Sequence, residues 1–215
     1  MAAGTMANPF PGRNEMLAKI QSILSLVRFP NLLIIAFTQY AMRYLLMEPL
    51  LPSDTFELQF GDFQFALLVF STMLIAAAGY IINDYFDTRA DLINKPARVV
   101  VGVAISRKVA MILHMILNIA GVGIGVYLAF YVGLPSLSLV FVLSTGLLWF
   151  YSTNYKKQFL VGNLTVAFLT GLVPLMVVLF EIPLLNREYG EVMIRYDADF
   201  NYLLAWVSAF SFFAF

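Results

Sequence analysis

The 215-residue sequence contains no cysteine and only one histidine, His114. The absence of cysteine excludes disulfides, thiolate zinc sites and cysteine nucleophiles. His114 lies inside an apolar run, so we expect a packed or hydrogen-bonded helix residue there rather than a metal ligand. Charge is also scarce. Lys, Arg, Asp and Glu make up 12% of the residues and balance to a net charge of zero, which argues against a nucleic-acid partner.

What remains is the composition of a membrane protein. Hydrophobic residues make up 61% of the chain, against roughly 45–50% in soluble domains, and the mean hydropathy is +0.83. Several apolar runs approach the roughly 20 residues that a helix needs to cross a bilayer. The sequence therefore predicts an all-α, polytopic bundle of transmembrane helices. The expected spans cover residues 29–47, 63–83, 109–131, 137–151 and 160–180, with a sixth beginning near residue 200.

The two ends of the chain have different characters. Residues 1–27 are polar at first and then amphipathic over residues 15–27, which predicts a tail followed by an interfacial helix. Residues 28–215 form the expected transmembrane domain. Its first apolar run is long enough to span, so no cleavable signal is expected. The sixth span would hold only about 16 residues, fewer than the roughly 20 required, so we expect five complete spans and a domain truncated at its C-terminus.

The segments between the spans are expected to be exposed. Residues 48–62 and 181–199 read as acidic loops, and an acid-rich connection follows residue 83 as far as Lys108. Within the third span, Gly121, Gly123 and Gly125 could be taken for a dinucleotide fingerprint. No strand precedes them, so close helix packing is the better interpretation. Pro174 predicts a kink in the fifth span.

Basic residues indicate the orientation in the membrane. The side of the N-terminus holds ten of the 13 Lys and Arg residues, and the other side holds three: Arg43, Arg187 and Arg195. Since cytoplasmic loops carry the excess of Lys and Arg, the N-terminus is predicted to be cytoplasmic. The expected location is the cell (inner) membrane of a bacterium or archaeon. Lys156 and Lys157 then face the same compartment as the acid-rich connection.

That connection begins with four oxygen-bearing side chains on one helical face: Asn83, Asp84, Asp87 and Asp91. A solvated, accidentally acidic helix end is one interpretation. Acids at the mouth of a membrane helix are costly and usually functional, however. Mg²⁺ is commonly held by one or two carboxylates plus substrate phosphates. We therefore favour a Mg²⁺ site for a phosphate-bearing substrate, with cations following at once in Lys95, Arg98, Arg107 and Lys108.

The stretch NDYFDTRADLINKPARVVVG resembles the first aspartate-rich motif and following loop of the UbiA superfamily of intramembrane prenyltransferases. The NDxxD core, the third Asp and the NKP-x-R segment all match. Many members follow that Arg with Pro, whereas this chain has Val99; the RVVVG variant is similar to the digeranylgeranylglyceryl phosphate synthase-like branch. The matching residues are Asn83, Asp84, Asp87, Asp91, Asn94, Lys95, Pro96 and Arg98.

The resemblance implies a UbiA-type fold and transfer of a prenyl group from a prenyl diphosphate to a membrane-accessible acceptor. The acceptor would be geranylgeranylglyceryl phosphate, an aromatic or quinone precursor, or haem. Asp84, Asp87 and Asp91 would hold Mg²⁺, with Asn83 beside them. Positions that contact the diphosphate match Arg98, Lys156 and Lys157, and Lys95 would also bind the substrate. For Lys156 and Lys157, membrane anchoring by their positive charge is an equally good interpretation. The family's second aspartate-rich motif is missing, so a non-catalytic membrane binding protein is the alternative function.

A prenyl cation would also need aromatic walls. Tyr80 and Tyr151 are the candidates nearest the acidic motif. In the first span, Arg28, Asn31 and Gln39 are polar groups near or inside the membrane. Asn31 and Gln39 share one face and would line an acceptor pocket, or else form structural hydrogen bonds between helices.

Overall fold

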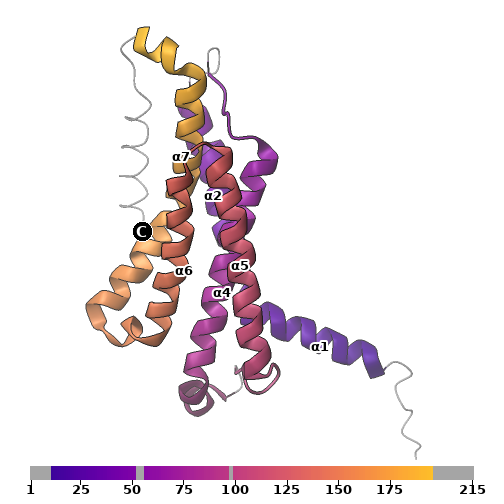
Figure 1. The fold of residues 1–215 in the computed structure, drawn as a ribbon. Helices are drawn as coiled ribbons and strands as arrows, with labels where there is room; N and C mark the ends of the chain where they lie inside the picture. Colours follow the sequence, from indigo (N-terminus) through magenta and orange to yellow (C-terminus); the bar gives the residue numbers. More distant parts are fainter. Residues whose placement is uncertain (1–10, 52–55, 97–98, 196–215) are drawn as a thin grey trace, which may run out of the picture.

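The computed structural model describes residues 11–51, 56–96 and 99–195. Six helices make up most of this part: α1 (Pro11–Leu26), α2 (Phe29–Ala41), α4 (Asp62–Asn94), α5 (Arg107–Tyr131), α6 (Ser138–Thr153) and α7 (Phe159–Arg195). Shorter turns join them: a π-helical segment (Met42–Met47), α3 (Glu48–Leu50) and 3₁₀ turns at Pro135–Leu137 and Tyr155–Lys157. Figure 1 shows α2, α4, α5, α6 and α7 as an elongated bundle, from which α1 projects.

The predicted all-α membrane fold is confirmed. Four helical segments are long and apolar enough to cross a membrane: Asp62–Asn94, Arg107–Tyr131, Pro135–Thr153 and Phe159–Glu191. A fifth arises if the bent pair Met16–Leu26 and Phe29–Met47 counts as one span. The predicted sixth span lies outside the described residues.

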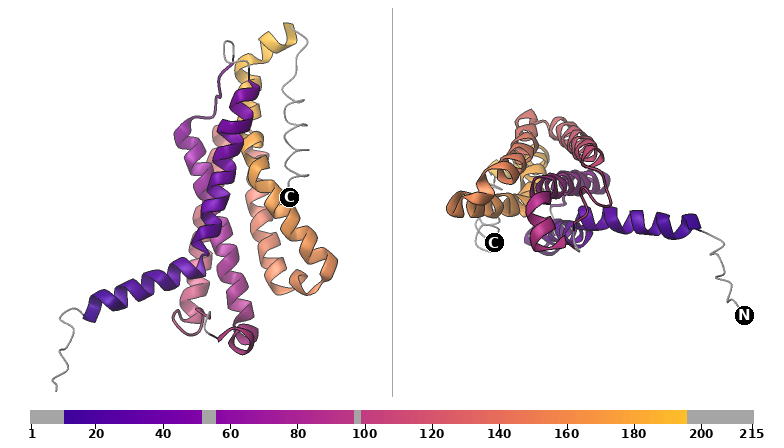
Figure 2. Two further views of the ribbon diagram at one scale, coloured as in Figure 1. Left: turned by 180° about the vertical axis from the view of Figure 1, so that it is seen from behind. Right: turned by 90° about the horizontal axis from the view of Figure 1, so that it is seen from below.

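The chain bends by 53° between α1 and α2. At the bend Arg28 adopts the left-handed conformation, with φ 50° and ψ 55°, which costs a non-glycine residue roughly 1–2 kcal/mol. Pro30 follows in the first turn of α2, where a backbone N–H would have no acceptor within the helix. Helix α1 therefore points away from the bundle (Figure 2) and exposes Met16, Ile20 and Ile23. Its placement at the membrane interface stays a prediction.

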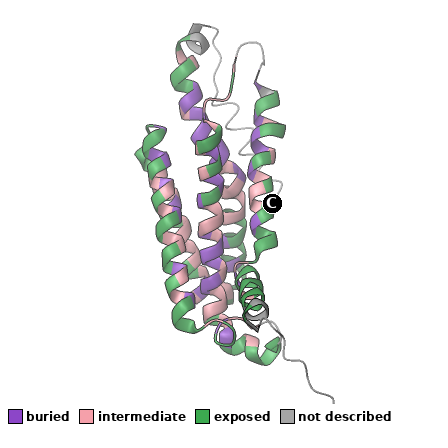
Figure 3. Ribbon diagram, turned by 90° about the vertical axis from the view of Figure 1, so that its right-hand side faces the viewer, coloured by how far each residue is buried: buried purple, intermediate pink, exposed green. Residues whose placement is uncertain are grey.

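Helix α4 is the centre of the bundle and packs against α2, α5, α6 and α7. Small residues let the neighbouring backbones approach closely. Ser71 of α4 donates a hydrogen bond to the Gly121 carbonyl of α5 at 2.7 Å, and both Gly121 and Gly125 are buried. Close helix packing is thus the role of these two glycines, whereas Gly123 is exposed. Figure 3 shows buried residues forming stripes along the long helices.

Two helices continue beyond their predicted membrane spans. Helix α4 reaches Asn94, past the predicted end of the span at residue 83, and it carries the three aspartates on one helix, as their spacing predicted, so the connection starts at Lys95. Helix α7 continues to Arg195 through most of the predicted acidic loop 181–199. The reason is Glu181: it is fully buried and paired with Arg43, rather than exposed at a loop.

Arg43 and Glu181 form a buried polar cluster at the end of the bundle away from the aspartates. Arg43 Nη1 donates to Glu181 Oε2 at 2.8 Å, and Arg43 Nη2 donates to the Phe60 carbonyl. The second carboxylate oxygen accepts the backbone N–H groups of Gln59 and Phe60 at 2.5 and 2.9 Å. The cluster joins α7 to the segment after α2 and to the chain leading into α4. Of the predicted loop 48–62, the described residues 48–51 and 56–62 are therefore only partly exposed.

Candidate functional site

A cavity of about 540 Å³ opens between α2, α4, α6 and α7. Its polar lining includes Arg28 just before α2, Asn31 of α2, Tyr80 and Asn83 of α4, and Tyr151 of α6. Most of the remaining lining is apolar, with Ile34, Ile75, Phe141, Leu169 and Met176 among its residues. The volume lies within the roughly 300–1,000 Å³ of typical ligand pockets. An amphiphile with one polar end and a long apolar chain would match such a lining.

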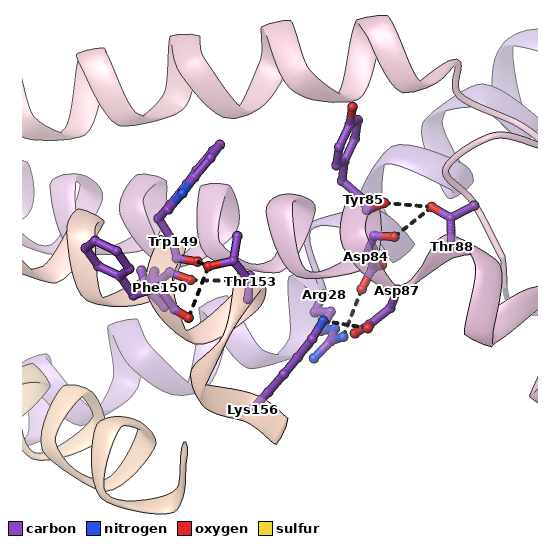
Figure 4. A network of polar contacts seen from close by, with 11 residues as sticks. Arg28, Asp84, Tyr85, Asp87, Thr88, Trp149, Phe150, Thr153 and Lys156 are labelled. Atoms are coloured by element: carbon purple, nitrogen blue, oxygen red, sulfur yellow. Dashed lines mark hydrogen bonds and ion pairs between the residues drawn. The ribbon is translucent and has the colours of Figure 1, made fainter. Parts of the chain in front are cut away.

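Two ion pairs lie beside the polar residues of the cavity. Arg28 Nη2 is 3.0 Å from Asp84 Oδ1, and Lys156 Nζ is 2.5 Å from Asp87 Oδ1. Figure 4 shows both cations reaching α4 from other parts of the chain. The four side chains are 16–43% exposed, so water reaches both pairs and weakens them in part.

Arg28 contacts the Tyr80 ring as well as the Asp84 carboxylate. Its guanidinium carbon lies 4.8 Å from the centroid of the Tyr80 ring, and the Tyr80 hydroxyl accepts a hydrogen bond from Asn31 at 3.4 Å. Strained backbone conformations concentrate at functional sites. The left-handed Arg28 is the one non-glycine residue with positive φ in the described ranges, and it stands at the polar end of the cavity.

The structure brings most of the predicted site residues together. Asn31, Asn83, Tyr151 and Arg28 line the cavity, while Asp84, Asp87 and Lys156 form the adjacent ion pairs. The two adjacent lysines differ in their surroundings: Lys156 contacts Asp87, whereas Lys157 is exposed. Lys95 is exposed at the end of α4, and Arg98 lies outside the described residues.

The metal-binding groups fit Mg²⁺ only in part. Within residues 11–51, 56–96 and 99–195, no group of three or more acidic or histidine side chains is arranged to hold a metal ion. Asp84 and Asp87 nevertheless supply two hard carboxylate oxygen donors, three residues apart on α4. Two carboxylates with substrate phosphates are the usual ligands of Mg²⁺. This donor set therefore suits a metal that arrives with a phosphate-bearing substrate.

Two polar residues have structural roles. Gln39 is buried and donates hydrogen bonds to the Val173 carbonyl at 3.0 Å and to Thr72 Oγ1 at 3.3 Å. Of its two predicted roles, it therefore has the one of a structural hydrogen bond between helices. His114 Nδ1 lies 2.9 Å from the Ala78 carbonyl. As predicted, it is a hydrogen-bonded helix residue. The deep apolar lining, including Phe141 and Met176, could not be predicted, because helices that are apolar all round give no sign of which face borders a cavity.

Comparisons with known proteins identify relatives of this chain. A family model described as the UbiA prenyltransferase family matches residues 50–215. The digeranylgeranylglyceryl phosphate synthase of Methanothermobacter thermautotrophicus is 42% identical over 114 residues, covering 52% of this chain and 39% of that protein. The Methanosarcina barkeri synthase is 30% identical over 159 residues, covering 73% and 53%.

A solved structure from work on digeranylgeranylglyceryl phosphate synthase in membranes shares the fold. It has a TM-score of 0.63 and 24% sequence identity, and it covers 76% of this chain and 53% of that chain. The chain thus spans about half the length, or less, of the curated relatives named above. The family model covers more than half of the chain, and the chain belongs to the UbiA prenyltransferase family.

Proposed function

We propose that this protein transfers a prenyl group from a prenyl diphosphate to the hydroxyl of a glycerol-phosphate lipid, with geranylgeranylglyceryl phosphate as the acceptor. The observation that carries the proposal is the apolar cavity with Arg28 in its polar lining and the ion-paired Asp84, Asp87 and Lys156 beside it. The acceptor is proposed from the curated relatives, which are named digeranylgeranylglyceryl phosphate synthase.

The reaction breaks the allylic C–O bond of the prenyl diphosphate and forms an ether C–O bond to the acceptor. Diphosphate leaves with the bonding electrons, and the acceptor hydroxyl gives its proton to the departing diphosphate. Arg28 and Lys156 would move from their carboxylates to the diphosphate and neutralise its growing charge. Tyr80 and Tyr151 would present aromatic faces to the allylic cation, and the apolar lining would exclude water from it.

Mg²⁺ is part of the proposal. Asp84 and Asp87 would hold the ion together with the substrate phosphates, and Asp91, half-buried one turn further along α4, would support them. When bound, Mg²⁺ would act as a Lewis acid on the leaving diphosphate. Asn83 would bind beside them through its side-chain amide.

The test is a transfer assay on the protein purified into lipid nanodiscs. Geranylgeranyl diphosphate labelled in its prenyl chain is supplied with Mg²⁺ and, in parallel, with geranylgeranylglyceryl phosphate, an aromatic acid acceptor or haem. We expect a labelled ether lipid with the first acceptor and none after EDTA. Label in the aromatic product or in haem would overturn the acceptor. Binding of the diphosphate without transfer to any acceptor would favour the non-catalytic alternative.

We also propose that the N-terminus and the aspartate end of the bundle face the cytoplasm, on the basis of the ten-to-three distribution of basic residues. Since the chain has no cysteine, single cysteines report topology cleanly. A cysteine at the exposed Asn186 should react with an impermeant maleimide added to intact cells, and one at the exposed Gln158 should not. The reverse labelling pattern would show the opposite orientation.

A further inference from the structure

Helix α5 lies behind the cavity without lining it. The cavity is lined by α2, α4, α6 and α7, while α5 packs against α4 and α6, beside both in Figure 1. Its glycines differ in their surroundings. Gly121 and Gly125 are buried and Gly123 is exposed, so two of the three face the helices that form the cavity wall.

Gly125 makes room for an aromatic ring. A Cβ atom at Gly125 would lie no more than 2.6 Å from three atoms of the Phe141 ring, whereas ordinary contacts begin at 3.4 Å. Phe141 lines the cavity. The ring therefore occupies space that any side chain at position 125 would fill. Gly121 makes room for Ile75, another residue that lines the cavity, in the same way. A Cβ atom at Gly121 would lie 2.7 Å from Ile75 Cγ1.

Phe141 stands far from the polar end. On α6 it lies ten residues before Tyr151, or about 15 Å along the helix axis. Its ring packs against Phe180 of α7, with centroids 5.9 Å apart, and Met176 lines the cavity from the same helix. A chain whose diphosphate lies beside Arg28 would bring its last isoprene units to this depth.

We propose that Gly125, by accommodating the Phe141 ring, sets the depth of the cavity and so determines the longest prenyl chain that binds. This inference rests on the proposed function. A methyl group at position 125 would force the ring towards the cavity, because a packed interior has no other space for it. The far end of the longest chain would then lose its place, while a chain one isoprene unit shorter would still fit.

The experiment measures the binding of prenyl thiolodiphosphates, which resist ionisation, to the whole chain in nanodiscs with Mg²⁺. Gly125→Ala should lower the ratio of C20 to C15 affinity at least tenfold, about the smallest effect that a misfitting methylene group produces in an apolar pocket. Gly123→Ala is the matched control: an added Cβ meets nothing within 4 Å there. Gly123→Ala should leave the ratio of C20 to C15 affinity unchanged. The double variant Gly125→Ala with Phe141→Leu should restore the ratio to the wild-type value.

Phe141→Leu alone supplies an independent measurement should Gly125→Ala fail to fold. It should deepen the cavity and improve C25 binding relative to C20. An unchanged ratio in both variants, or an equal loss for every chain length, would overturn the role in depth while leaving the proposed function intact. A wild-type protein that binds none of the thiolodiphosphates would overturn the proposed function itself.

Discussion

Replacing Asp84 or Asp87 by Asn should reduce prenyl transfer about 1,000-fold or more without unfolding the protein. Each variant keeps the shape of the side chain but removes a charge that would hold Mg²⁺ against the leaving diphosphate. A metal contributes several kcal/mol to the stabilisation of developing charge, and each 1.36 kcal/mol is a factor of ten in rate. The measurement is kcat/KM in the nanodisc assay, with thermal unfolding of each variant recorded alongside.

Two matched variants test the specificity of this loss. Glu188→Gln removes a negative charge from an exposed side chain beyond Glu181 on α7, and it should leave the rate unchanged. Asp91→Asn should reduce the rate less than Asp84→Asn, since Asp91 lies outside the two ion pairs at the cavity. Activity of Asp87→Asn at the wild-type level would contradict the assignment of these carboxylates to the metal.

Replacing Arg43, the buried cation at the other end of the bundle, by alanine should lower the stability of the protein without a direct effect on prenyl transfer. Arg43→Ala leaves the fully buried Glu181 without its cation, and breaking a buried ion pair in this way costs about 3–5 kcal/mol. We expect a fall of that size in the free energy of unfolding, measured in mixed micelles with increasing SDS. Arg187→Ala removes an exposed cation from the same helix as Glu181 and should change it by about 0.5 kcal/mol or less.

A double variant separates the charge from the hydrogen bonds. In Arg43→Met with Glu181→Gln, no buried charge remains, and the amide oxygen still accepts the N–H groups of Gln59 and Phe60. Replacing a buried ion pair by neutral groups is often close to neutral, so the double variant should be more stable than Arg43→Ala alone. Equal stability of Arg43→Ala and Arg187→Ala would refute the structural role of the cluster.

The sequence predicted those features that depend on neighbouring residues. Long apolar runs indicated the spans, and the helical spacing of Asp84, Asp87 and Asp91 predicted a shared face. Periodicity could not predict where α7 ends, because Glu181 is accommodated by Arg43, which lies 138 residues away in the chain. Long-range pairing of this kind turns a residue that looks like a loop acid into part of a helix.

The residues that line the cavity could also be predicted only in part. Arg28, Asn31 and Tyr151 could be proposed because polar or aromatic groups stand out near the end of an apolar run. Phe141 and Gly125 could not, since their role depends on how α5 and α6 pack together. Lys156 and Lys157 are adjacent and chemically identical, and only the three-dimensional structure separates the lysine that pairs with Asp87 from the exposed one.

We expect one cavity to hold the diphosphate beside Arg28 and Lys156 and the prenyl chain among the apolar residues of α6 and α7. The most direct measurement is photolabelling with a geranylgeranyl thiolodiphosphate that carries a diazirine on its last isoprene unit, followed by mass spectrometry of the labelled peptides. We predict label in the peptides containing Phe141 and Met176, and its loss when unlabelled geranylgeranyl thiolodiphosphate competes. Label confined to the exposed outer face of α5, around Ile116 and Ile119, would contradict the account.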